Sequence, residues 1–146
     1  MKRFLLAILL LSLTTSFSSG LFAQDTTRTT PYHQQTNNYV VLTKKIPQLK
    51  PILLTAEAFK QEDGDTFGDF RIVICGQGIV DITDRAQIDP FIAQAKEFGV
   101  KLVACGFSLD KFKVARTDVP ADIEIVDNGI QYNFTLQKAG YYSLSL

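Results

Sequence analysis

The chain has few of the residues that most enzyme centres use. It contains one histidine, His33, two cysteines, Cys75 and Cys105, and equal numbers of basic and acidic residues, 15 of each. A single histidine in a polar stretch is expected to be solvated, and two cysteines without a nearby histidine disfavour a metal centre. No paired histidine and carboxylate is available for hydrolase chemistry. We therefore expect no metal and no cofactor.

Signatures of nucleotide, nucleic-acid and membrane binding are also missing. Gly76-Gln77-Gly78 lacks the third glycine of a dinucleotide fingerprint, and no phosphate-binding loop occurs elsewhere. Removal of Lys2 and Arg3 with an export signal would leave 13 basic against 15 acidic residues, a formal charge of −2. That balance provides no electrostatic footprint for nucleic acid or for an anionic membrane.

The longest apolar run is short and lies at the beginning of the chain. Two basic residues precede an apolar stretch of about ten residues, whereas a membrane-spanning helix needs about 20. Together with the small residue Ala23, this pattern predicts a cleaved export signal over residues 1–23 and a periplasmic or secreted mature protein that does not bind a membrane. Residues 24–38 contain no Val, Leu, Ile or Phe, so we expect a disordered tether there, followed by one folded domain over 39–146.

Apolar runs and helical spacings alternate along this domain. The pattern predicts strands over 39–43, 70–75, 100–105, 123–126 and 141–146, and helices over 48–61, 89–98, 108–114 and 130–138. Asp89 and Pro90 are the expected cap and first residue of the second helix. Regular alternation of strand and helix favours a three-layer α/β/α sandwich with a five-stranded, mostly parallel sheet.

Two segments thirty residues apart share a pattern that ends in Cys-Gly. They are FRIVICGQGI at 70–79 and VKLVACGFSL at 100–109. If the two strands are neighbours, Cys75 and Cys105 both lie at the carboxyl edge of the sheet, where α/β proteins bind ligands. Three alternatives remain open at this point: a reactive thiol pair, two cysteines that only pack in the core, and a disulfide, which export would favour.

The domain carries several short motifs: GVKLVACG at 99–106, Val119-Pro120, DNGI at 127–130, Leu136-Gln137 with Gly140-Tyr141, and CGQG at 75–78. In their order and spacing, these motifs resemble the exported branch of the DsrE/DsrF-like sulfur-relay family. The resemblance spans residues 39–146 and implies a domain with the YchN-like fold that assembles into a trimer or hexamer. In sulfur-carrying members a cysteine at the end of the third strand holds a persulfide, and Cys105 occupies that position here.

These observations predict a candidate site around Cys105. A cysteine between a strand end and a helix start is placed to become a thiolate, Gly106 would let a sulfur donor approach, and Ser108 would cap the following helix. Lys111 and Lys113 would add positive potential. Cys75 is a candidate resolving thiol, and the expected ligand-binding positions are Gly76, Gln77, Gly78, Gly106 and Ser108. The expected partners are further copies of the chain and proteins that donate or accept sulfane sulfur. The alternative function is a non-catalytic small-ligand-binding or assembly module of the same fold.

Overall fold

Five parallel strands form one sheet in the order β4-β3-β2-β1-β5. The computed structural model describes residues 36–146, so the predicted export signal and most of the predicted tether lie outside the described residues. The strands are β1 (Asn37–Thr43), β2 (Phe67–Ile74), β3 (Val100–Cys105), β4 (Glu124–Val126) and β5 (Tyr142–Ser145). The α helices of the described part are α1 (Leu49–Asp63), α2 (Arg85–Phe98), α3 (Gly106–Phe112) and α4 (Gly129–Lys138).

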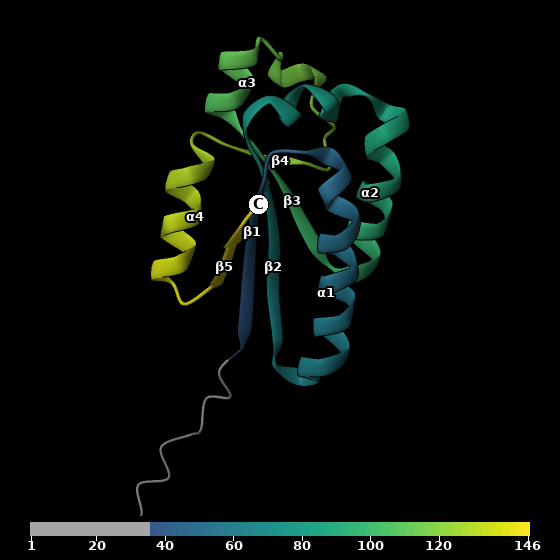
Figure 1. Ribbon diagram of the computed structural model, residues 1–146, viewed down its shortest axis with the longest axis vertical. Coiled ribbons are helices and arrows are strands. Elements are labelled where there is room, and N and C mark those ends of the chain that lie inside the picture. Colours follow the sequence, from purple (N-terminus) through teal and green to yellow (C-terminus); the bar gives the residue numbers. More distant parts are fainter. Residues whose placement is uncertain (1–35) are drawn as a thin grey trace, which may run out of the picture. The chain divides into compact units, whose positions relative to one another are not determined.

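Helices cover both faces of the sheet. The helices α1 and α2 lie together against one face, α4 lies against the other, and α3 lies at the carboxyl edge (Figure 1). A large apolar cluster fills the space under α1 and α2, and a smaller one fills the space under α4. The predicted α/β fold with a five-stranded parallel sheet is therefore confirmed, and every strand pair is parallel.

The first strand begins earlier than the sequence predicts. Residues 37 and 38 were expected in the tether because they are polar, yet both belong to β1. The Asn37 side chain donates to the Asp63 carboxylate (3.0 Å), and the Asn38 side chain accepts from the Asp69 backbone N–H (2.8 Å). These two bonds connect the start of β1 to the end of α1 and to β2, so hydrogen bonding replaces apolar burial in ordering this segment.

The second helix also begins earlier than predicted. Its N-cap is Asp84, which accepts a hydrogen bond from the Ala86 N–H (3.0 Å), and Pro90 lies inside the helix. Asp89 forms an ion pair with Arg85 one turn before it (2.8 Å) instead of capping. The prediction at Asp89 was wrong because the chain offers two aspartates with capping chemistry, and the first of them begins the helix.

Candidate functional site

The two cysteines lie side by side at the carboxyl edge of the sheet. Strands β2 and β3 pair in register up to Ile74 and Ala104, and the next residue of each strand is a cysteine. Cys75 and Cys105 are free thiols, 6 % and 3 % exposed. The prediction that these two strands are neighbours in the sheet is confirmed. No disulfide joins the two cysteines in this structure. Both belong to the smaller apolar cluster, which also contains Val40, Leu42, Val73, Val103 and Leu136.

Cys105 is the centre of a hydrogen-bond network. The backbone N–H of Gly129 donates to the Cys105 sulfur at 3.2 Å. The Ser108 hydroxyl accepts from the Gly76 N–H at 2.9 Å. Ser108 and the Cys75 thiol line the same pocket as Cys105, and together with the Gly129 N–H they lower the pKa of the Cys105 thiol. Polar groups around this one sulfur atom thus favour its anionic form.

The two thiols consequently differ in acidity. Burial alone would raise the pKa of Cys105, but hydrogen bonds from Ser108, Gly129 and Cys75 outweigh burial, and the pKa lies below the ordinary 9.0. Burial and, to a smaller extent, the neighbouring Cys105 raise the pKa of Cys75 to about 12, although Lys44 acts to lower it. At neutral pH, Cys75 is therefore a protonated donor, and Cys105 is the thiol that ionises more readily.

Gly129 allows α4 to begin directly above the thiols. A Cβ atom at this position would lie 2.6 Å from the Cys75 sulfur, 2.8 Å from a Val73 methyl group and 3.1 Å from the Cys105 Cβ. Real Cβ atoms do not approach other atoms so closely, so a larger residue would push the helix away. The absence of a side chain is what brings the Gly129 N–H within reach of the Cys105 sulfur.

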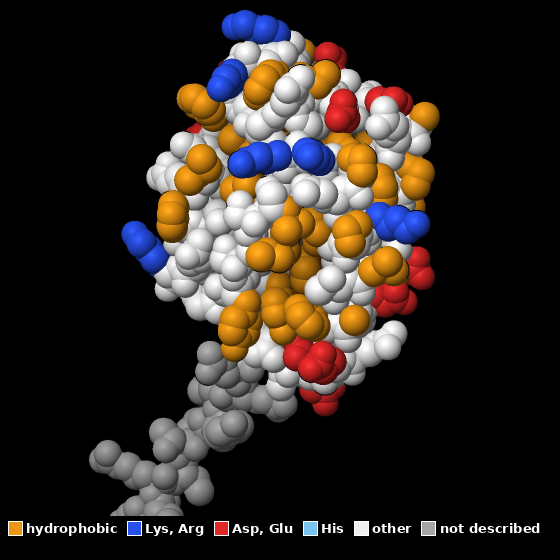
Figure 2. Space-filling view, viewed as in Figure 1, with side chains coloured by type: hydrophobic (Ala, Val, Ile, Leu, Met, Phe, Trp, Pro, Cys, Tyr) orange, Lys and Arg blue, Asp and Glu red, His pale blue; other side chains and the backbone are white. Residues whose placement is uncertain are grey.

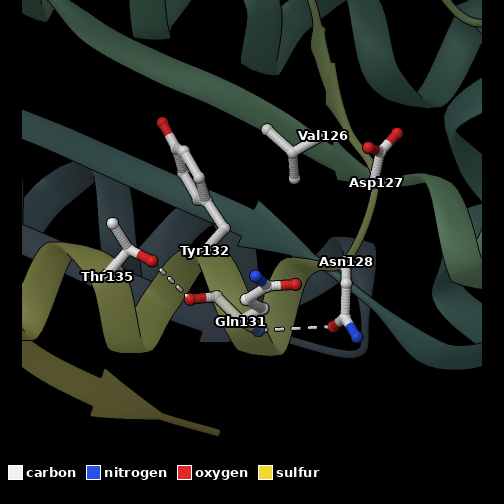
Figure 3. A pocket seen from close by; sticks show the side chains of 6 residues that line it. All are labelled: Val126, Asp127, Asn128, Gln131, Tyr132 and Thr135. Carbon is white, nitrogen blue, oxygen red and sulfur yellow. Dashed lines mark hydrogen bonds between the residues drawn. The ribbon is translucent and has the colours of Figure 1, made fainter.

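Asn128 fixes the direction of this helix start. Its side-chain oxygen accepts from the backbone N–H groups of Ile130 (3.0 Å) and Gln131 (3.3 Å), as expected of an N-cap (Figure 3). One side of Asn128 lines the pocket that contains the thiols, and the other lines a neighbouring polar pocket of about 200 Å³. Neither cysteine lines that second pocket, whose walls are Val126, Asp127, Asn128, Gln131, Tyr132 and Thr135 (Figure 3).

A pocket of about 420 Å³ opens over the two thiols. Its rim includes two strongly exposed apolar side chains, Phe107 (64 % exposed) and Ile130 (59 % exposed). Among residues 36–146, the only charged residues that line it are Lys44 and Lys111. The pocket thus combines a buried sulfur, apolar walls and positive charge. Its lining residues are Leu42, Lys44, Cys75, Gly76, Cys105, Phe107, Ser108, Lys111, Phe112, Asn128 and Ile130.

Four of the residues that the sequence selected come together in this pocket: Cys75, Gly76, Cys105 and Ser108. Ser108 has a different local role from the predicted one. The helix α3 begins at Gly106 with Cys105 as its N-cap, so Ser108 lies in the first turn and does not cap the helix. Its hydroxyl instead accepts a hydrogen bond from the Gly76 N–H, and Ser108 lowers the pKa of the Cys105 thiol.

The other three selected residues do not line the thiol pocket. Gln77 and Gly78 lie in a 3-10 helix (Gly76–Thr83) and line a separate pocket of about 540 Å³. Gly78 passes so close to β1 that a Cβ atom there would lie 2.2 Å from the Lys44 carbonyl oxygen. Gly106 is buried, and its missing side chain would point at the Arg116 guanidinium, 2.7 Å away. The single crevice that the sequence predicted therefore does not include these residues. The 3-10 helix after Cys75 places Gln77 and Gly78 at a second pocket, and Gly106 faces Arg116 and the Val126 carbonyl oxygen.

Sequence reasoning did not assign Gly129, Asn128, Lys44, Phe107 or Ile130 to the site. Lys44 directly follows β1, so the rule that ligands bind at the carboxyl ends of parallel strands would have found it. Asn128 and Gly129 belong to the DNGI motif of the family resemblance, which gave them no role in the site. The sequence signal for both residues is a capping residue followed by glycine. This signal predicts where the helix begins, but it does not show that the helix start lies against the two thiols.

Residues 36–146 contain neither a metal-binding cluster nor a helix that could span a membrane. In this part of the chain, no group of three or more His, Cys, Asp or Glu side chains is arranged to hold a metal ion. Within the same residues, none of the helices has the length and apolar character needed to cross a bilayer.

Solved structures share the fold of this chain. One is a protein of unknown function from Methanobacterium thermoautotrophicum, with a TM-score of 0.60 and 14 % identity over 75 % of this chain and 99 % of that one. Another is a conserved protein of unknown function from Bacteroides thetaiotaomicron, with a TM-score of 0.59 and 18 % identity over 75 % of this chain and 95 % of that one. The sequence matches no family model and no curated protein. At these identities the likeness establishes the α/β fold alone.

Proposed function

We propose that this protein is an exported sulfur carrier that holds sulfane sulfur as a persulfide on Cys105. The observation that carries the proposal is the position of the Cys105 sulfur, which accepts a hydrogen bond from the Gly129 N–H (3.2 Å) and lines a pocket together with Ser108 and Cys75. The resemblance of the Cys105 segment to the DsrE/DsrF-like family supports the same role. Export rests on the signal predicted over residues 1–23.

The loading step needs no cofactor. With thiosulfate as donor, the Cys105 thiolate attacks the outer sulfur, a new S–S bond forms at Cys105, and the sulfur–sulfur bond of thiosulfate breaks. The electron pair of that bond leaves with sulfite, and the protein carries the persulfide. A thiolate acceptor then attacks the outer sulfur of the persulfide and regenerates Cys105. Hydrogen bonds that stabilise the Cys105 anion favour it both as nucleophile and as leaving group.

Cys75 is the resolving thiol in this scheme. Its attack on the inner sulfur of the Cys105 persulfide would form a bond between the two cysteines and release hydrogen sulfide. Because the pKa of Cys75 is raised to about 12, it is almost entirely protonated at neutral pH, and this discharge is slow. The persulfide then persists long enough to meet an acceptor.

Exposure of the purified protein to thiosulfate or inorganic polysulfide is expected to add the mass of one sulfur atom to Cys105. Intact-mass spectrometry before and after reduction measures the addition, which dithiothreitol should remove. Cys105→Ser should gain no sulfur, while Cys75→Ser should still be loaded and should lose its sulfur more slowly. If the wild type gains no reducible sulfur, the carrier function fails and the pocket belongs to a non-catalytic binding or assembly module.

We further propose that the chain forms a trimer or hexamer through the β5 edge. All of β5 is exposed, and Tyr142, Leu144 and Leu146 present apolar side chains that are 61 %, 55 % and 43 % exposed. Hydrophobic side chains gather on this face of the molecule, over β5 and the adjoining part of α1 (Figure 2). An open apolar edge strand is a template for pairing with another chain.

Light scattering at micromolar concentration is expected to show an assembly that Leu144→Lys disrupts, because the substitution places a charge in the contact. Val80→Lys is the matched control. Val80 is also an exposed apolar residue (42 %), but it lies on the 3-10 helix that follows β2 and not on β5. A wild-type protein that is monomeric at these concentrations would contradict the assembly proposal.

A further inference from the structure

The thiol pocket is much larger than an inorganic sulfur donor requires. Thiosulfate has five heavy atoms, and at the ~30 Å³ that a water molecule occupies in the liquid they would fill only about 150 Å³. The pocket measures about 420 Å³, within the range of roughly 300–1,000 Å³ typical of sites for organic ligands. Volume alone therefore favours a donor that carries an organic group on its sulfur.

The walls of the pocket are largely apolar, which suits an organic group. Leu42 and Phe112 line the pocket close to the thiols, and Phe107 and Ile130 stand at its rim. The last two are 64 % and 59 % exposed, although they are large apolar side chains. An organic body in the pocket would remove part of this surface from water, which is favourable by roughly 25 cal/mol per Å².

The charge of the pocket is positive. Lys44 and Lys111 are its only charged lining residues, and within residues 36–146 neither forms an ion pair. The Lys111 ammonium lies over the Phe112 ring, 5.6 Å from its centroid, which holds the charge beside an apolar wall. Lys44 follows β1 and packs its aliphatic stem near Gly76. An anionic group on the ligand would compensate both ammonium groups.

We propose that the donor for this pocket is a small organic persulfide that bears a carboxylate. The proposal rests on the proposed sulfur transfer through Cys105 and names its substrate class. The Cys105 thiolate attacks the outer sulfur of R–S–SH, and a bond forms between the Cys105 sulfur and that outer sulfur. The original S–S bond breaks, its electron pair leaves on the thiolate R–S⁻, and the proton stays on the transferred sulfur. Lys44 and Lys111 hold the carboxylate, and Phe107 and Ile130 cover the organic body.

Two matched probes test this assignment: N-acetylcysteine persulfide, which carries a carboxylate, and its methyl ester, which does not. Loading of Cys105 is followed by intact-mass spectrometry at low ionic strength. We expect the acid to load about 10-fold faster than the ester, at the lower end of the rate enhancement that a cleft of one charge sign provides. The preference should disappear in Lys44→Gln/Lys111→Gln and remain in Lys138→Gln, which changes a lysine at the far end of α4. Both organic probes should load more slowly on Phe107→Ser, while thiosulfate should not.

The outcomes separate this inference from the function on which it rests. If thiosulfate loads Cys105 faster than both organic probes, and acid and ester load equally, the organic substrate class is wrong and the carrier function stands. If no donor loads Cys105, the carrier function itself fails. If the acid is preferred but the double lysine variant keeps that preference, the assigned anion contacts are wrong.

Discussion

Iodoacetamide is expected to alkylate Cys105 at least about 30-fold faster than Cys75 at pH 8. A thiol with a pKa below 9.0 is ionised roughly 1,000-fold more at this pH than one with a pKa of about 12. The less basic thiolate is intrinsically weaker as a nucleophile, and a Brønsted coefficient of ~0.4–0.5 removes about 20-fold of that advantage. Trypsin places the two cysteines in different peptides, 72–85 and 102–111, so both rates are measured in the same wild-type sample.

The pH profile gives the sign of each shift. A lowered pKa means that the alkylation rate of Cys105 reaches half of its maximum below pH 9, whereas the rate of Cys75 still rises at pH 10. Ser108→Ala removes the hydroxyl that lowers the pKa of the Cys105 thiol, so its profile should move to higher pH and its rate at pH 7 should fall about threefold. Ser143→Ala, which changes a serine of β5, is the control. Equal rates for the two cysteines across pH 6–9 would contradict the assigned roles.

Gly129→Ala is expected to impair stability and thiol reactivity together. The new methyl group would lie 2.6 Å from the Cys75 sulfur and 2.8 Å from a Val73 methyl group, in a buried region that cannot accommodate it without a shift of α4. Overpacking of this kind costs about 1–3 kcal/mol of unfolding free energy. The shift also draws the Gly129 N–H away from the Cys105 sulfur, so the Cys105 alkylation rate at pH 7 should fall about threefold. Urea unfolding and alkylation of the same preparation measure the two effects.

A double variant tests whether the clash with sulfur is the cause. Cys75→Ala deletes the closest atom, so Gly129→Ala should cost less in a Cys75→Ala background than in the wild type. The expected coupling is at least ~0.5 kcal/mol, the lower limit seen for residues in contact. Strict additivity of the two substitutions would show that the contact with the Cys75 sulfur is not the source of the cost.

The pairing of the two thiols could be predicted from the sequence, and the complete pocket could not. Matched Cys-Gly steps at the ends of consecutive apolar runs imply neighbouring parallel strands, because such strands follow one another in a sheet. This reasoning concerns β2 and β3 only. Gly129 lies 24 residues after Cys105 in sequence, and its contact with the sulfur depends on how α4 packs against the sheet. Tertiary packing of that kind leaves no local signal in the residues involved.

The assignment of Gln77, Gly78 and Gly106 shows the limit of reasoning from proximity along the chain. Each lies within three residues of a cysteine, yet none of them lines the thiol pocket, whereas Ser108, three residues after Cys105, does. After each Cys-Gly step the backbone enters a helical turn that directs successive residues to different sides. Proximity to a cysteine along the chain therefore does not predict which of the following residues line the pocket.

The unequal division of the core between the two faces of the sheet links ligand binding to local stability. The thiols belong to the smaller cluster, under the single helix α4, while α1 and α2 share the larger one. Elements with fewer buried apolar contacts open at lower free energy than the rest of a domain. A molecule that spans from Ile130 on α4 to Phe107 on α3 would brace the helix whose first N–H group binds the Cys105 sulfur. Occupancy of the pocket would then slow amide hydrogen exchange in α4 before it slows exchange in α1 or α2. The same ligand would thus be the substrate and would also stabilise the helix that forms part of its binding site.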